Sequence, residues 1–490
     1  MSEDNTVPTQ PVEGERKHDT GYPPRLLEFM RTGWGESPIP GLTRLPQAAN
    51  HAQRRARLSE LFPGQTLVIP TGGEKQRAND TFFRFRAGSD FAWLTGDYDP
   101  EGVLVLHATA GGHDAVLYRR ARKSRSTDEF FRSAQYGELW IGRSHSLEEK
   151  SLELGVETRN VTGLVSVLEH LAPAATRVLR GFDADVDAKV AVTGSGERDV
   201  ELAERLSELR ALKDAWEIAQ LQEAVDITVR GFEDVARVLP ATGAVSERLI
   251  EGVFALRARH EGNGVGYDSI VGAGSHATTL HWIRNDGATT PGELLLMDMG
   301  VENNHLYTAD VTRTVPVSGS FTPLQRQVYD LVYASQQAGI DAIKPGVVYK
   351  DITQVCMRVL AEGLHDLGLL TGSVEATMEP DSQLYRRWTL HGYGHFLGLD
   401  VHDCANARRE HYHDGEFQPG HVVTVEPGLY FQADDELVPA ELRGVGVRIE
   451  DDILVTADGT VNLSDGLPRT SAQVETWLGE QRAAGPRLPG

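Results

Sequence analysis

Short apolar runs alternate with amphipathic stretches between residues 60 and 200. Runs of this length, rich in valine, leucine and isoleucine, are typical of buried strands, whereas apolar residues at three- and four-residue spacing are typical of helices. We expect strands at residues 67–72, 90–96, 102–108, 115–120 and 177–183, and helices at residues 148–154 and 161–171. This alternation predicts an α/β domain.

A longer helical pattern begins after residue 200. Ile218, Leu221 and Val225 recur at three- and four-residue spacing, which predicts a helix with one apolar face, and Asp214 is expected to cap its start. We place a domain boundary near Ala211, because a chain of 490 residues is too long for one hydrophobic core.

Three segments follow from this boundary. We expect a disordered tail at residues 1–20, an N-terminal domain at residues 21–210 and a C-terminal domain at residues 211–490. The tail is polar, charged and contains prolines, and it lacks the apolar segment of a signal peptide.

The C-terminal domain shows a repeated arrangement of helices and strands. One predicted helix starts at Thr322-Pro323 and ends at the sequence KPG, and a second has Ile352 and Leu364 on its apolar face. One pair of strands, at residues 294–300 and 307–317, precedes these helices, and another pair, at residues 422–430 and 445–456, follows them. This order hints at an internal duplication.

An acidic residue interrupts each of these four apolar strands. A buried carboxylate costs several kcal/mol unless it is paired or binds a metal. One such acid could form a structural salt bridge or lie on an edge strand, but four of them beside a histidine cluster favour a metal site. The acids are Asp298, Asp310, Glu426 and Glu450.

The turn between the first two strands decides how their acids face each other. A three-residue turn at Asn303, Asn304 and His305 would place Asp298 directly opposite Asp310. Opposed carboxylates repel each other, and a cation between them removes the repulsion. Oxygen-rich ligation favours Mn(II) over zinc of the thiolate type.

The histidine cluster has the sequence LHGYGHFLGLDVHD, at residues 390–403. His391 and His395 are spaced as in a zinc-binding helix, but two glycines lie between them and no glutamate follows the first histidine. The segment is therefore expected to be irregular backbone, with His402 as its third histidine.

The combination of LLLMDMG, YTADVTRT, HGYGHFLGLDVHD, TVEPGLY and VRIEDD resembles the pita-bread metallopeptidases, which include aminopeptidase P, prolidase and methionine aminopeptidase. The stretches RFRAGSDFAWLTGDYDPEGVLVL and ELWIGR are similar to the accessory domain of aminopeptidase P. The resemblance implies an α/β (α+β) fold class, with an N-terminal creatinase/aminopeptidase P-like domain and a C-terminal pita-bread catalytic domain.

The resemblance also implies a ligand set for two divalent metal ions per subunit, most plausibly Mn(II). Asp310 and Glu450 would bridge the two ions, and His395 would be the sole imidazole ligand. Compared with the family pattern, the turn between the first two acids has one additional residue, which we expect the loop to absorb. The five implied ligands are Asp298, Asp310, His395, Glu426 and Glu450.

Further residues take catalytic or substrate-binding roles by the same resemblance. A hydroxide bridging the metals would attack the peptide carbonyl, Glu426 would accept its proton, and His402 would stabilise the oxyanion. His281 and His391 would hold the substrate. Neutral core imidazoles are the alternative for His391 and His402.

Four other side chains are candidates with a structural alternative. Arg448 could orient carboxylates, relay protons through Asp90 or form a plain salt bridge. Tyr430 could bind substrate or donate a hydrogen bond behind the ligands. Trp140 could contact substrate or belong to the core. Arg313 is expected to support Asp310.

The amino-acid composition narrows the range of binding partners. A net charge of −23 disfavours nucleic acid and anionic membranes as partners, and no apolar run is long enough to span a bilayer. The two cysteines form no CxxC motif and are expected to be reduced thiols of a cytoplasmic protein. The resemblance implies a homodimer or homotetramer.

The function expected from these observations is a dinuclear Xaa-Pro aminopeptidase, which removes the first residue of peptides with proline at the second position. The accessory domain favours aminopeptidase P over methionine aminopeptidase. Prolidase has nearly the same catalytic half and stays an alternative. The filled acid positions disfavour a non-catalytic peptide-binding module and a creatinase-like hydrolase without metal.

Overall fold

The computed structural model describes residues 12–16, 21–194, 196–240 and 242–489. The chain divides into two compact units between Ala203 and Glu204, inside helix α9 (Glu197–Ala211), close to the boundary expected near Ala211. The predicted disordered tail, residues 1–20, lies largely outside the described residues. Within it, Glu15 is described and accepts hydrogen bonds of 3.0 and 2.8 Å from the guanidinium of Arg132.

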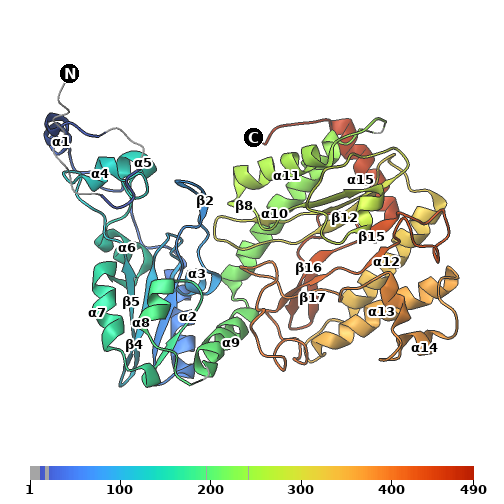
Figure 1. Ribbon diagram of the computed structural model, residues 1–490. Coiled ribbons are helices and arrows are strands. Elements are labelled where there is room, and N and C mark those ends of the chain that lie inside the picture. The colour runs from blue at the N-terminus through green and yellow to red at the C-terminus, as the bar shows by residue number, and fades with distance from the viewer. Residues whose placement is uncertain (1–11, 17–20, 195, 241, 490) are drawn as a thin grey trace. The chain divides into compact units, whose positions relative to one another are not determined.

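A five-stranded mixed sheet organises the N-terminal unit, in the order β6-β5-β4-β1-β7 (Figure 1). The central strands β1, β4 and β5 pair antiparallel, and β6 and β7 join the two edges in parallel. A short hairpin, β2–β3, stands apart from this sheet. The strands of this unit are β1 (Thr66–Pro70), β2 (Gln76–Ala78), β3 (Thr81–Phe82), β4 (Val103–Thr109), β5 (Gly112–Arg119), β6 (Glu157–Asn160) and β7 (Thr176–Val178).

Helices bury both faces of the central strands. Val68, Val105 and Val116 pack with residues of α7 and α8, whereas the alternate residues Leu67 and Leu104 are also fully buried, and α2 contacts β5. The α-helices before α9 are α1 (Pro24–Met30), α2 (Ala48–Leu61), α3 (Ser89–Thr95), α4 (Glu129–Arg132), α5 (Glu138–Ile141), α6 (Leu147–Leu154), α7 (Leu164–His170) and α8 (Ala184–Lys189). Short 3₁₀ turns are η1 (Val161–Gly163) and η2 (Pro173–Ala175).

One predicted strand of this unit is wrong. Residues 90–96, with the sequence DFAWLTG, form most of helix α3 instead, and Gly96 ends the helix in the left-handed conformation at φ 72°. Every residue of α3 is buried. A run buried on all sides carries no polar periodicity, so its pattern does not separate a strand from a helix.

The C-terminal unit contains two pairs of long helices, each followed in the chain by strands. The helices are α10 (Ala215–Val238), α11 (Glu247–Glu261), α12 (Pro323–Ala342), α13 (Tyr349–Asp366), α14 (Val374–Met378) and α15 (Ser471–Ala484), with 3₁₀ turns η3 (Gly274–Thr278) and η4 (Leu384–Arg387). The strands are β8 (Gly264–Val265), β9 (Ile270–Ala273), β10 (Leu294–Asp298), β11 (Val301–Glu302), β12 (Thr312–Pro316), β13 (Val422–Val425), β14 (Gly428–Tyr430), β15 (Gly446–Arg448), β16 (Asp451–Thr456) and β17 (Gly459–Asn462).

The expected helix starts are confirmed by their hydrogen bonds. Asp214 caps α10 by accepting from the amides of Trp216 and Glu217, while the Glu217 side chain accepts from the amide of Asp214. Thr322 and Gln325 form the same reciprocal capping box at the start of α12. Each box satisfies backbone donors that the first turn of a helix leaves without partners.

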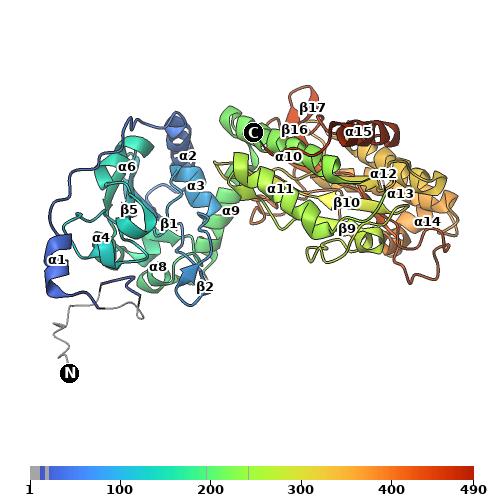
Figure 2. The same ribbon diagram turned by 90° about the horizontal axis from the view of Figure 1, so that it is seen from above.

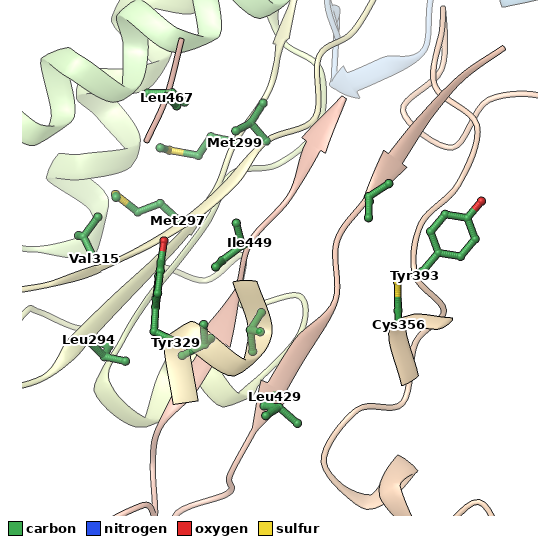
Figure 3. Close-up of a cluster of buried hydrophobic side chains, with 14 of the residues drawn as sticks. Leu294, Met297, Met299, Val315, Tyr329, Cys356, Tyr393, Leu429, Ile449 and Leu467 are labelled. Atoms are coloured by element: carbon green, nitrogen blue, oxygen red, sulfur yellow. The ribbon is translucent and has the colours of Figure 1, made fainter. Parts of the chain in front are cut away.

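The long helices pack on one face of the strands. Helix α11 contacts β9, and α12 contacts β13, β14 and β15. Both views show the helix pair α10–α11 apart from the pair α12–α13 (Figures 1 and 2). Met297, Tyr329, Cys356 and Ile449 belong to the one large apolar cluster between helices and strands (Figure 3). The opposite face of β10 carries Leu296, which packs in a smaller cluster with Ile270, Trp282 and Tyr430.

The first pair of acid-bearing strands differs from its predicted register. Asp298, the last residue of β10, pairs with Thr312 rather than with Asp310, and a bridge between Glu302 and Thr308 continues the hairpin. Residues 303–307 therefore form a five-residue loop in place of the expected three-residue turn. The side-chain oxygen of Asn303 accepts from the amides of His305 and Tyr307, which stabilises this wider loop.

The second pair keeps one register over its whole length. Val425 pairs with Asp451 and Gly428 pairs with Arg448, so Glu426 and Glu450 occupy facing positions between these two ladders. The direct opposition expected for the first pair of acids thus occurs in the second.

Candidate active site

A cavity of about 540 Å³ lies in the C-terminal unit. All five predicted metal ligands line it, together with His281, His391, His402 and Arg448. Tyr267, Leu280, Ile283 and Val401 contribute to its remaining walls. His281 and His402 are exposed and His391 is half-buried, so none of the three is a core imidazole.

Three of the four acids stand at or next to the end of a strand, and Asp310 lies two residues before β12. Asp298 ends β10, Glu426 directly follows β13, and Glu450 directly precedes β16. The backbone amide of Glu450 donates to the carbonyl of Thr312 at 3.1 Å, which joins the two strand pairs. Residues far apart in the sequence thereby bring their carboxylates to one side of the strands.

The two aspartates share one face although they are offset in register. The hydroxyl of Tyr267 lies 2.7 Å from Oδ1 of Asp298 and 2.6 Å from Oδ1 of Asp310. Gly300 makes this arrangement possible, because a Cβ atom at that position would lie 1.7 Å from the carbonyl oxygen of Ala309. The additional residue in the turn has therefore not moved Asp310 to the opposite face.

Sequence reasoning missed Tyr267. It precedes β9 in a glycine-rich segment, and neither periodicity nor a motif separates it from other surface tyrosines. Its partners indicate its importance, since one hydroxyl contacts two buried carboxylates.

His395 faces the carboxylates through one ring nitrogen. Its Nε2 atom lies 3.2 Å from Oδ2 of Asp310 and 3.6 Å from Oε1 of Glu426, while Nδ1 lies 3.0 Å from the carbonyl oxygen of Phe396. A proton on Nδ1 satisfies that carbonyl and leaves the Nε2 lone pair for a metal. Asp310, His395 and Glu450 each offer a ligand atom, all within 4.8 Å of one another.

Glycine in HGYGH allows the histidine segment to approach a strand closely. A Cβ atom on Gly394 would lie 2.0 Å from the carbonyl oxygen of Thr424, in β13. The same segment is held by hydrogen bonds from the His395 amide to Thr424 Oγ1 and from the Thr424 amide to the His395 carbonyl. The irregular backbone expected here is confirmed.

Burial and mutual repulsion make this cluster costly without cations. Burial raises the pKa of Glu450 well above its ordinary value, and the charges of Asp310, Glu426 and Asp298 raise it further. Burial also raises the pKa of Asp298 and brings that of Glu426 to about 7. Divalent cations would remove this repulsion, so an oxygen-rich donor set with one imidazole fits a pair of hard or borderline metal ions.

His391, Tyr430 and Arg448 form a chain beside the carboxylates. Nε2 of His391 lies 2.7 Å from the Tyr430 hydroxyl, which accepts a 3.0 Å hydrogen bond from Nη1 of Arg448. Nη2 of Arg448 donates to Oδ2 of Asp298 at 2.6 Å. Burial, followed by the charge of Arg448, lowers the pKa of His391 to about 3, so this imidazole is neutral and accepts from Tyr430.

The surroundings of Arg313 and Trp140 bear on the roles expected for these two residues. Arg313 donates to the carboxylate of Asp451 and to the carbonyl of Glu450, so its expected support of Asp310 is wrong. Trp140 lies in α5 of the N-terminal unit with 43% of its surface exposed, and therefore it is not a core residue. Its substrate-binding role stays a prediction.

Comparisons with known proteins agree with both units. Residues 51–179 match the family model described as the N-terminal domain of aminopeptidase P, and residues 219–457 match metallopeptidase family M24. Aminopeptidase P from Escherichia coli, solved with the inhibitor Pro-Leu, has a TM-score of 0.79 and 29% identity and covers 90% of this chain and 100% of its own. The expected fold class, with a pita-bread C-terminal domain, is confirmed.

Two relatives extend the match over nearly the whole chain. Xaa-Pro aminopeptidase 1 of Streptomyces coelicolor is 53% identical over 483 residues, which cover 97% of this chain and 98% of the relative. Xaa-Pro aminopeptidase 2 of the same organism is 51% identical over 467 residues, covering 94% and 98%. This chain is therefore an aminopeptidase and belongs to the aminopeptidase P branch of metallopeptidase family M24.

Proposed function

We propose that the protein is a two-metal Xaa-Pro aminopeptidase, which releases the first residue of peptides with proline at the second position. The observation that carries this proposal is the convergence of four carboxylates and His395 in one cavity, beside the neutral His391. The names of the relatives and the Pro-Leu inhibitor of the Escherichia coli enzyme support proline at the second position.

The metal ligands in this proposal are the five side chains expected from the sequence. Asp310 and Glu450 would bridge two divalent ions, most plausibly Mn(II), and His395 would bind through Nε2. When bound, the ions supply Lewis acidity that activates a water molecule and polarises the scissile carbonyl.

The protein's own groups handle the proton and the leaving nitrogen. Glu426 accepts the proton of the attacking water and passes it to the leaving nitrogen, and it lies in the same cavity as the other proposed ligands. His402, exposed in the same cavity, donates a hydrogen bond to the developing oxyanion.

Substrate positioning falls to the histidines and their partners. His281 binds the substrate backbone, while His391 contacts the proline side and is held in place by Tyr430. Arg448 fixes both Tyr430 and Asp298, so it acts on the reaction by positioning other groups. Trp140 is a candidate substrate contact from the N-terminal unit.

Competition between two substrates tests this function. The chelator-treated protein is reloaded with Mn(II) and given Ala-Pro and Ala-Pro-Leu together, with the products identified by mass spectrometry. Release of alanine from the tripeptide, with the dipeptide largely intact, is the expected result. Preferential cleavage of Ala-Pro would make the protein a prolidase, and cleavage of neither peptide by the metal-loaded protein would refute both functions.

The proposed protein is a homo-oligomer of the cytoplasm. The family resemblance supports a homodimer or homotetramer, which light scattering would distinguish. Cys356 and Cys404 are both free and buried, which supports a reducing compartment such as the cytoplasm. No described helix is both long and apolar enough to cross a membrane.

A further inference from the structure

A second, smaller cavity adjoins the first in the C-terminal unit. It measures about 170 Å³ and is lined by residues of α13, η4 and the histidine segment. His391 and Gly392 line both cavities. A Cβ atom on Gly392 would meet no other atom within 4 Å, so the space beside this residue is open.

The position of His391 indicates which part of a bound peptide would reach this cavity. If His391 contacts the proline of the substrate, as the proposed function holds, the residue that follows proline leaves the active site past His391 and Gly392. None of the five proposed metal ligands lines the smaller cavity, so it lies beyond the reacting groups. Met357 and Thr389 are buried at its walls and Tyr385 adds an aromatic surface, which suits one amino-acid side chain.

Arg386 supplies a positive charge at this cavity. Its Nη1 atom donates to Oε1 of Gln383 at 3.0 Å and its Nη2 atom donates to the carbonyl of Leu390 at 3.1 Å. Both partners are neutral, and no carboxylate among the described residues forms an ion pair with it. The neighbouring Arg387 differs, since it binds both carboxylate oxygens of Asp435 at 2.9 and 2.8 Å.

We propose that this cavity binds the third residue of the substrate and that Arg386 binds a carboxylate of that residue. The inference rests on the proposed function, because it takes the proline side of the substrate from His391. An exposed guanidinium with two neutral partners keeps donors free for a carboxylate. The preferred substrates are therefore tripeptides, in which the residue directly after the proline carries the free C-terminal carboxylate.

Three substrates separate the possible sources of the carboxylate. Ala-Pro-Leu carries a C-terminal carboxylate, Ala-Pro-Leu amide carries none, and Ala-Pro-Asp amide carries one on its side chain. The unmodified, Mn(II)-loaded enzyme is expected to cleave Ala-Pro-Leu with a kcat/KM about fivefold above that for Ala-Pro-Leu amide. This is the effect on binding expected of a partly exposed ion pair. A similar advantage for Ala-Pro-Asp amide would show that the site also accepts a side-chain carboxylate.

Substitution of Arg386 tests whether this residue causes the preference for a free carboxylate. Arg386→Gln is expected to reduce the ratio of the kcat/KM for Ala-Pro-Leu to that for Ala-Pro-Leu amide to about one, mainly through KM. Arg386→Lys should restore part of this ratio. Arg358→Gln is the matched control, because Arg358 is exposed, lies in the same unit and lines neither cavity. The leucine amide is an internal reference, since a general disturbance of the active site lowers both rates equally.

Two results would overturn the inference. One is a ratio near one in the unmodified enzyme, and the other is a ratio that Arg386→Gln leaves unchanged, including the case in which both rates fall together. Failure of the proposed function is distinguishable from both, because the unmodified enzyme would then cleave none of the three peptides.

Discussion

The two strand pairs that carry the acids of the active site differ in register and in support. In the first pair, Asp298 and Asp310 are offset and share one hydrogen-bond partner, Tyr267. In the second pair, Glu426 and Glu450 occupy facing positions, and among the described residues their hydroxyl donors differ: Thr424 for Glu426 and Thr312 for Glu450. The carboxylates of the first pair thus share a hydrogen-bond donor. In the part of the chain that the structure describes, the carboxylates of the second pair have no shared hydroxyl donor, so we expect them to depend more strongly on bound cations to reduce their repulsion.

Support for the second pair comes instead from the first. The hydroxyl of Thr312 donates to Oε2 of Glu450 at 2.6 Å. Arg448 lies in the second pair but donates to Asp298 in the first. The two halves of the catalytic unit are therefore not equivalent copies, and each completes the environment of the other.

Removal of a carboxylate from the second pair should have the largest effect. Glu450→Gln keeps the shape of the side chain but removes a charge that, in our proposal, bridges two ions. We expect metal content to fall below two ions per subunit and kcat/KM to fall by more than about a hundredfold, beyond the usual loss for an outer partner of a metal ligand. Elemental analysis beside peptide kinetics checks this, and two retained ions would contradict the ligand assignment.

The metal-free protein should lose stability as the pH rises. Burial raises the folded-state pKa of Glu426 from 4.5 to about 7, so the folded state binds the proton more tightly and its stability falls between these pH values. The loss is about 3 kcal/mol at most. His395 acts in the same direction between pH 6.5 and about 9, because Asp310 and Glu426 raise its pKa against the opposing effect of burial.

Thermal melting of chelator-treated protein across this range measures the loss. Glu426→Gln should remove the part between pH 4.5 and 7, and Mn(II) should remove the loss of stability at rising pH because the ions replace the protons. A metal-free protein whose melting temperature stays constant from pH 4.5 to 9 would show that the carboxylates are not strained by burial.

A methyl group at Gly300 should disturb the first pair only. The added Cβ atom would collide with the Ala309 carbonyl, next to Asp310, and overpacking of this kind costs about 2 kcal/mol. Gly392→Ala is the control, because its Cβ atom would meet open space. Chemical unfolding measures both; equal stability of the two variants would mean that the hairpin adapts without cost.

Loss of the hydroxyl shared by the two aspartates should have the smallest effect. Tyr267→Phe is expected to weaken Mn(II) affinity by about tenfold, as for other partners that orient metal ligands. Tyr333→Phe is a matched control in the same unit, away from the cavity. Metal titration measures both affinities, and an unchanged affinity in Tyr267→Phe would show that the two carboxylates are placed by backbone register alone.

Residue chemistry made the four acids of the cavity predictable from the sequence. Asp298 and Glu450 were identifiable because acids are rare in apolar strands, and Asp214 and Thr322 were identifiable as caps by their short-range pattern. The comparison of side-chain types along one strand needs no knowledge of distant parts of the chain.

Features that depend on backbone geometry were not predictable. The offset of Asp310 follows from a loop in which Leu306 adopts a left-handed conformation at φ 68°, and leucine gives no signal for it. Helix α3 has the sequence pattern of a strand because it is buried on every side. Tyr267 was missed because its role comes from the packing of β9 beside β10.

The bonds between the two strand pairs also set an order of events during synthesis. Asp298 and Asp310 leave the ribosome well before Glu426 and Glu450, and the contacts of Thr312 with the amide and carboxylate of Glu450 form only when both pairs are present. A nascent chain that ends before Glu450 carries the other four proposed ligands but lacks the glutamate that would complete the set. In our proposal, capture of the ions is therefore a late event, which follows the synthesis of the second strand pair.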